Sequence, residues 1–184
     1  MTTKTQYRWI IDGIDQISAV EFHELITRNT AHISRTFPLT LSACQNPPAT
    51  EAFIITCIQN EQKKENYYFY LRNLETRNLI GYICIKKIDN KLMKCELAYF
   101  IDIEFEGKGI ITEAVSQVIE FCFSMLRMNK VFICTSKENI ASQRIALKQG
   151  FKKEGVLRQE FLSGDGILED VVYFGLLKSE FDER

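Results

Sequence analysis

The stretch that decides the fold runs Cys95-Glu96-Leu97-Ala98-Tyr99-Phe100-Ile101 and continues, after a short connection, as Glu106-Gly107-Lys108-Gly109-Ile110-Ile111-Thr112-Glu113-Ala114. Its pattern is that of a β-strand, a tight glycine turn and the first turn of a helix. The free backbone N–H groups at a helix N-terminus, with the positive end of the helix dipole, form a binding site for anions. Because Gly107 and Gly109 carry no side chain, a phosphate can approach the backbone closely. The stretch therefore predicts a site for a phosphate-bearing cofactor.

Two better-known phosphate motifs do not match this turn. A P-loop needs a glycine upstream and a Ser or Thr after Gly-Lys, but those positions hold Asp102 and Gly109. A dinucleotide fingerprint needs a third glycine where Thr112 stands. The turn is therefore an anion site of a different kind.

The composition is that of an ordinary globular protein. The chain has 184 residues, of which 46% are hydrophobic and 26% charged, and we expect one domain over residues 1–184. The net charge of −1 argues against direct nucleic-acid binding, which usually needs a strong basic excess. Cationic partners such as amines remain open.

The cysteines and the first residues indicate where in the cell the protein acts and whether it binds a metal. The six cysteines and two histidines lack zinc-site spacing, so no metal is expected. Cys84, Cys95, Cys122 and Cys134 lie in apolar runs and are interpreted as small buried hydrophobic residues. Residues 1–6 lack the apolar segment of a signal peptide, and no apolar run approaches the ~20 residues that span a membrane. We expect a cytoplasmic protein with reduced thiols and no membrane contact.

The periodicity of apolar residues predicts the order of the elements. Helices are expected over 15–29, from a Thr50 N-cap to about 65, over 110–125, and from an Asn139 N-cap to about 149. The segment 36–50 contains Pro47-Pro48, which we expect to interrupt any element. Strands are expected over 6–11, 67–71, 79–88, 92–101, 131–134, 151–162 and 170–177. This order predicts an α+β, three-layer fold with a mixed, mostly antiparallel sheet of about seven strands between helices.

A second motif follows the glycine turn. It reads Asn139-Ile-Ala-Ser142-Gln-Arg-Ile-Ala-Leu-Lys-Gln-Gly150-Phe151, and it leads to Glu154-Gly155-x-Leu157-Arg158 and a closing block with Asp170 and Tyr173. Together, in this order, these motifs resemble the GNAT superfamily of acyl-CoA-dependent N-acetyltransferases over residues 6–181. Within it the chain is similar to the RimJ/RimL branch, which acetylates N-terminal amines of ribosomal proteins and other amines. The resemblance implies acetyl-CoA as co-substrate and a GNAT sheet that splays at the acyl-CoA site.

The resemblance also implies which residues hold acetyl-CoA. Pantetheine would lie in the splayed gap and bond to the strand backbone, with Asn139 and Ser142 beside it. The turn amides would bind the pyrophosphate, and the side chains of Lys108, Arg144 and Lys148 are further candidates for phosphate contacts. The strand residues are Tyr99, Phe100 and Ile101, and the turn residues are Gly107, Lys108, Gly109, Ile110, Ile111 and Thr112.

The chain departs from the family pattern at three positions. The family turn begins with Arg or Gln and ends with Gly or Ala, whereas this chain has Glu106 and Ile111. A carboxylate would repel a pyrophosphate, so we expect Glu106 to point away while the amides bind. Many relatives place a tyrosine acid in the later helix, where this chain has Ala146.

Amide formation needs a base for the amine, a group that polarises the thioester and an acid for the thiolate. The resemblance implies Glu160 as base, because it matches the acidic residue of the RimL branch. Glu96 is the alternative base, at the position used by the histone-acetyltransferase branch, and one could act through a water held by the other. Ser142 would act at the cofactor sulfur.

The motifs leave two functions open. One is an enzyme that acetylates a primary amine, which can be a protein N-terminus or a small amine. The other is a non-catalytic acyl-CoA-binding module of the same fold. The acceptor and the oligomeric state cannot be derived from these residues, although an exposed sheet edge or helix would allow a homodimer.

Overall fold

The computed structural model describes residues 7–183 and contains a mixed seven-stranded sheet. The strand order is β1-β2-β3-β4-β5-β7-β6, and β4 with β5 is the parallel pair in an otherwise antiparallel ladder. This architecture confirms the expected fold class. The strands are β1 (Trp9–Gly13), β2 (Tyr67–Asn73), β3 (Leu79–Asp89), β4 (Lys94–Ile101), β5 (Lys130–Ser136), β6 (Lys152–Leu162) and β7 (Leu168–Leu177).

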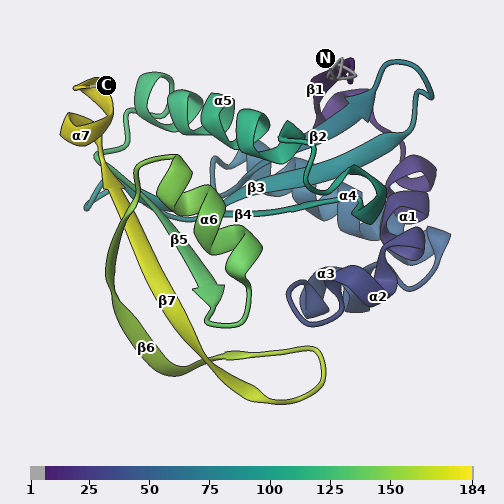
Figure 1. Ribbon diagram of the computed structural model, residues 1–184. Helices are drawn as coiled ribbons and strands as arrows, with labels where there is room; N and C mark the ends of the chain where they lie inside the picture. The colour runs from purple at the N-terminus through teal and green to yellow at the C-terminus, as the bar shows by residue number, and fades with distance from the viewer. Residues whose placement is uncertain (1–6, 184) are drawn as a thin grey trace, which may run out of the picture.

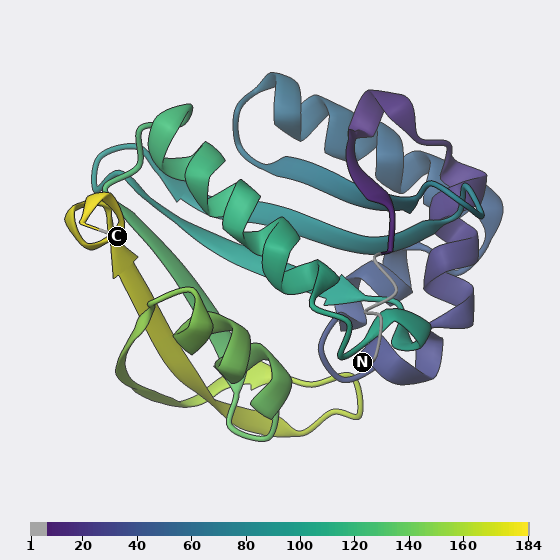
Figure 2. The same ribbon diagram turned by 45° about the horizontal axis from the view of Figure 1, so that its top comes forward.

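Helices cover both faces of the sheet. One face carries α5 and α6, and the other carries the N-terminal helices, as Figures 1 and 2 show. Two short 3-10 helices and a C-terminal helix complete the order. The helices are η1 (Ile14–Gln16), α1 (Ala19–Arg28), α2 (Thr30–Ile33), α3 (Pro38–Ala43), α4 (Pro47–Gln62), η2 (Ile103–Phe105), α5 (Ile110–Ser124), α6 (Ile140–Lys148) and α7 (Lys178–Asp182).

The sheet separates two hydrophobic cores. Because successive side chains of a strand point to opposite faces, Tyr70 packs with α1 and α4 while its neighbour Leu71 packs with α5. The core under α1 and α4 is aromatic, and the rings of Phe22, Tyr70 and Tyr82 pack with centroids 5.3 to 5.5 Å apart. The buried residues of the core under α5 are mostly aliphatic. The central strands are therefore packed on both faces.

The sheet splays between β4 and β5. Within the described residues their pairing is confined to three positions, which end at Glu96 opposite Phe132. Beyond that point β4 continues to Ile101 beside β3, while β5 continues to Ser136 beside β7. Figure 1 shows the two strands starting together near α7 and then diverging. The splay expected from the family resemblance is confirmed.

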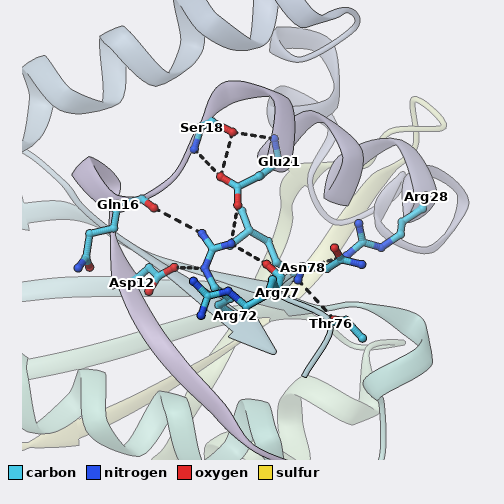
Figure 3. A network of polar contacts seen from close by, with 10 residues as sticks. Asp12, Gln16, Ser18, Glu21, Arg28, Arg72, Thr76, Arg77 and Asn78 are labelled. Carbon is cyan, nitrogen blue, oxygen red and sulfur yellow. Dashed lines mark hydrogen bonds and ion pairs between the residues drawn. The ribbon is translucent and has the colours of Figure 1, made fainter. Parts of the chain in front are cut away.

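The first helical segment is shorter than the periodicity predicts. Instead of one helix over 15–29, the chain forms η1 and then α1, which begins after Ser18. The Ser18 hydroxyl accepts from the Glu21 N–H, and the Glu21 carboxylate accepts from the Ser18 N–H, as Figure 3 shows. This capping box fixes the start of α1, because it satisfies backbone donors that a longer helix would use internally.

The expected Thr50 cap was wrong. Asn46 caps α4 by accepting from the Ala49 N–H, and Pro47 and Pro48 occupy the first helical positions. Proline is tolerated there because the first N–H groups of a helix have no internal partner. Thr50 is instead buried inside α4, and α3 lies in the segment expected to be irregular.

Several element ends differ from the expected ones. The first strand begins at Trp9, and its expected start at Gln6 lies outside the described residues, as does the segment 1–6 searched for a signal peptide. Asn139 caps α6 as predicted, by accepting from the Ser142 N–H at 3.1 Å. The C-terminal helix α7 was not anticipated.

Candidate active site

The glycine turn has the conformation that its sequence requires. Gly107 and Gly109 have φ angles of 69° and 83°, in the left-handed region that favours glycine. A Cβ at either position would meet open space, so the requirement is conformational rather than steric. Gly109 is the N-cap of α5, and among residues 7–183 no side chain caps it. The first amides of α5 therefore remain available to an anion.

Charged side chains beside the turn contact other parts of the protein. Glu106 Oε1 lies 3.4 Å from Nε2 of His32 on α2. The Lys108 ammonium lies 4.3 Å from the ring centre of Tyr7 and 4.7 Å from that of Phe105. These contacts connect the turn to the N-terminal half of the chain.

A cavity of about 470 Å³ opens where β4 and β5 separate. Its lining contains each residue assigned to catalysis from the sequence, Glu160, Ser142 and Glu96. Residues of α2, the connection to α3, and the β6–β7 hairpin line its far side. The cavity is therefore bounded by the splayed strands, by the N-terminal helical segment and by β6 and β7.

The strand register determines which backbone groups face the gap. The backbone N–H of Asp102 donates to the carbonyl of Ile80 on β3 at 2.8 Å. Every second residue of β4 before Asp102 therefore also directs its backbone N–H toward β3. Phe100, opposite Tyr82, belongs to that set. The amides of Tyr99 and Ile101 then face the gap, where β5 no longer pairs with them.

Two hydroxyl groups meet at the start of α6. The Tyr99 hydroxyl lies 3.1 Å from the Ser142 hydroxyl and 3.3 Å from the Ser142 carbonyl oxygen, so its single hydrogen has two acceptors within reach. Burial raises the pKa of Tyr99 to about 12, although the hydrogen bond with Ser142 opposes this shift. The phenol therefore keeps its proton at neutral pH. Sequence reasoning assigned only the backbone of Tyr99, although strand alternation already put its side chain on the face of Leu97 and Ile101.

Glu96 is buried and held by two lysines. Its carboxylate oxygens lie 3.3 Å from Nζ of Lys86 and 2.7 Å from Nζ of Lys87. Partial burial lowers the pKa of Lys87, but the hydrogen bond to Glu96 and the charge of Glu96 together outweigh burial and raise that pKa above its usual value. Sequence reasoning missed both lysines, because neither belongs to a motif and strand alternation alone does not bring two successive residues to one carboxylate. Glu96 thus forms ion pairs with both lysines.

Glu160 is exposed at a bulge of β6. The pairing of β6 with β7 is interrupted between Leu157 and Phe161, and Gln159 has a φ of 51°. The Gln159 N–H donates to Asp170 on β7 at 3.0 Å, which holds the bulge in place. Bulges redirect side chains, and this one lets Glu160 line the cavity from an edge strand.

Cys134 on β5 also lines the cavity. All six cysteines are free, and Cys134 differs from the expected fully buried thiol in being only half-buried. Burial and, to a smaller extent, nearby Glu96 raise the pKa of Cys134 to about 11. It is therefore a neutral thiol facing the site.

The two helices beside the gap are tied together at their ends. The Gln149 side chain donates to the carbonyl of Thr112 at 2.8 Å, which links the end of α6 to the first turn of α5. Arg144 and Lys148 are exposed on α6. In the part of the chain that the structure describes, no group of three or more His, Cys, Asp or Glu could hold a metal ion. Over the same residues, no helix has the length and apolarity needed to cross a membrane.

A splayed mixed sheet, a glycine turn at the start of α5 and a cavity between β4 and β5 define an acyl-CoA-dependent acetyltransferase. A family model described as "Acetyltransferase (GNAT) domain" matches residues 10–152, and the chain belongs to this family. It is 31% identical over 186 residues to the "Putative ribosomal N-acetyltransferase YdaF" of Bacillus subtilis (strain 168), covering 98% of this chain and 97% of that protein.

Two further comparisons bear on the family branch. The chain is 27% identical over 108 residues to a spermidine N(1)-acetyltransferase of Vibrio cholerae serotype O1, covering 59% of this chain and 62% of that protein. The solved structure of RimL, a ribosomal L7/L12 alpha-N-protein acetyltransferase in complex with coenzyme A, matches with a TM-score of 0.83 at 16% identity, covering 96% and 97% of the two chains. The expected GNAT family, N-acetyltransferase activity and likeness to ribosomal N-acetyltransferases are confirmed, and the match to RimL at 16% identity confirms the fold.

Proposed function

We propose that this chain acetylates the N-terminal amine of a protein, with Glu160 as the general base. The observation that carries the proposal is that Glu160, Ser142 and the gap-facing edge of β4 line one cavity. Glu96 is the weaker candidate for base, because Lys86 and Lys87 already contact its two oxygens. A carboxylate with free lone pairs can accept a proton from the ammonium directly or through a water.

The cofactor would lie along the splayed edge. Tyr99 and Ile101 would form hydrogen bonds with pantetheine through their backbone groups. Phe100 lies between them, and its own backbone groups would stay paired with β3. The pyrophosphate would meet the amides from Gly107 to Thr112, and Asn139 would reach pantetheine with its side-chain amide. Acetyl-CoA supplies the activated acetyl group, and the residues of the chain orient it and manage the protons.

The acceptor class rests on the relative with the fullest coverage. The match to YdaF extends over nearly the whole of both chains, whereas the match to the spermidine enzyme covers part of each. A flexible protein N-terminus can enter a cavity that a folded surface cannot. We therefore place a protein N-terminus first and a polyamine second.

The remaining finer assignments are supported by composition and surface. We propose a cytoplasmic location, supported by six free cysteines, and no direct role in nucleic-acid binding, supported by the net charge of −1. A homodimer could form through β6, which is an edge strand with largely exposed side chains.

The test replaces Glu160 with glutamine and measures steady-state acetylation of a peptide N-terminus, with spermidine as a second acceptor. We expect kcat to fall by about 100-fold or more, with unchanged calorimetric affinity for acetyl-CoA. Glu154→Gln, a carboxylate on the same strand that contacts Lys130, should leave the rate unchanged. A full rate for Glu160→Gln together with a loss for Glu96→Gln would move the base to Glu96. Acetylation of spermidine alone would replace the acceptor class.

A further inference from the structure

Helix α6 lacks the phenol that many relatives carry. The corresponding position is Ala146, which is fully buried in the aliphatic core. A large side chain there would have to displace that core rather than reach the cavity. Any phenol near the thioester must therefore come from another element.

Tyr99 brings a phenol to this place from β4. Its backbone lies on the gap-facing edge of the strand, and its ring reaches α6, where the hydroxyl lies 3.1 Å from Oγ of Ser142. Both residues line the cavity. A serine hydroxyl has one hydrogen and two lone pairs, so its hydrogen can point to only one acceptor at a time.

We propose that Tyr99 is a positioning residue whose hydroxyl donates to Oγ of Ser142 and thereby leaves the Ser142 hydrogen free for the departing sulfur. This inference rests on the proposed role of Ser142. Oγ is the nearer of the two acceptors within reach of the single Tyr99 hydrogen, at 3.1 Å against 3.3 Å for the Ser142 carbonyl oxygen, and a phenol is a stronger hydrogen-bond donor than an aliphatic alcohol. The raised pKa of Tyr99 is consistent with a group that holds its proton throughout the reaction.

The step balances without a proton leaving Tyr99. The amine nitrogen bonds to the carbonyl carbon, the carbon–sulfur bond breaks, and its electron pair goes to sulfur. Of the two protons that the ammonium loses, one leaves to solvent through Glu160 and the other ends on sulfur to give the thiol. Tyr99 contributes the orientation of one hydroxyl at the moment when charge develops on sulfur.

A double-mutant cycle tests the inference. Tyr99→Phe keeps the ring and should lower kcat about tenfold without changing the affinity for acetyl-CoA or the thermal midpoint. In the Ser142→Ala background the same change should cause no further loss, because a residue that acts through another has no separate effect. Tyr67→Phe is the matched control and should retain full activity. The Tyr67 ring packs against Phe121 of α5, with the ring centres 5.7 Å apart.

A second measurement separates leaving-group stabilisation from a purely structural role. With 4-nitrophenyl thioacetate as acyl donor, the leaving thiolate needs little stabilisation, so the deficit of Tyr99→Phe should shrink toward none. A structural defect would slow both donors equally.

The outcomes distinguish the proposed role of Ser142 from the proposed role of Tyr99. If Ser142→Ala retains the full rate, the proposed role of Ser142 is wrong and the inference falls with it. If Ser142→Ala is slow but Tyr99→Phe is not, only the inference is wrong. Equal losses from Tyr99→Phe in both backgrounds would also overturn it, because Tyr99 would then act without Ser142.

Discussion

Nε of Arg72 on β2 lies 2.5 Å from Oδ2 of Asp12 on β1, and both side chains are buried. Arg72 also pairs with Glu21 of the α1 capping box and donates to the carbonyls of Gln16 and Arg77. Figure 3 shows these groups converging on one guanidinium. A single buried cation thus joins the edge of the sheet to the first helix.

Removing this cation should destabilise the fold. Arg72→Met leaves the Asp12 carboxylate buried without its partner, and we expect the free energy of unfolding to fall by about 3 kcal/mol in urea titrations. Lys137→Met breaks the exposed pair with Asp170 and should cost less than about 1 kcal/mol. Equal costs for the two variants would show that burial does not determine the strength of these pairs.

The left-handed turn should be sensitive to a single methyl group. Gly109→Ala forces a Cβ into a φ of 83°, at a cost of about 1–2 kcal/mol. Relief of this strain should shift the first amides of α5, so calorimetry should show acetyl-CoA binding weakened about tenfold. Gly155→Ala on β6 also meets open space but has no left-handed φ, and it should bind normally. Normal binding by Gly109→Ala would mean that the turn amides do not hold the cofactor.

The hairpin wall of the cavity depends on a different glycine for a different reason. A Cβ on Gly164 would lie 1.9 Å from the Ser34 carbonyl oxygen, while Arg35 pairs with Asp165 and Glu169 beside it. Gly164→Ala should therefore push the β6–β7 tip away from the N-terminal helices. We expect a KM for the acceptor raised several-fold and an unchanged affinity for acetyl-CoA. An equal weakening of both would contradict a role restricted to the acceptor side.

The thiol of Cys134 should react only at high pH. Because burial raises its pKa to about 11, the thiolate becomes abundant later than for an ordinary cysteine. Iodoacetamide labelling, read by peptide mass spectrometry, should keep accelerating from pH 8 toward pH ~11 and should slow when coenzyme A fills the cavity. Labelling that levels off near pH ~8.5 would indicate an exposed, unperturbed thiol.

The sequence predicted the elements that have strong local signals. The antiparallel strands β2, β3 and β4 and the Asn139 cap of α6 depend on neighbouring residues, and they were confirmed. The N-terminal third was less predictable, because Asn46 and Thr50 are both good caps and only packing decides between them. Thr50 is buried and its hydroxyl contacts His23, so it cannot face the end of a helix.

The sequence also predicted the extent of the domain and the roles of the catalytic residues. That residues 1–184 form one domain, and that Glu160, Ser142 and Glu96 act as described, remain predictions. The structure brings all three side chains to one cavity. It adds three groups that no local pattern indicated, namely Lys86, Lys87 and the Tyr99 hydroxyl. Each of them contacts a residue on a neighbouring strand or far away along the chain.

By itself, the sequence determined the family, the glycine turn and the order of the seven strands, because each is set by residues close together in the chain. The tertiary structure alone decided which contacts the candidate catalytic groups make. Glu96 is held by two lysines, Glu160 reaches the cavity through a bulge, and Tyr99 meets Ser142 across the gap. Such relationships depend on strand register and on the divergence of β4 from β5, and these arise only when distant segments pack together.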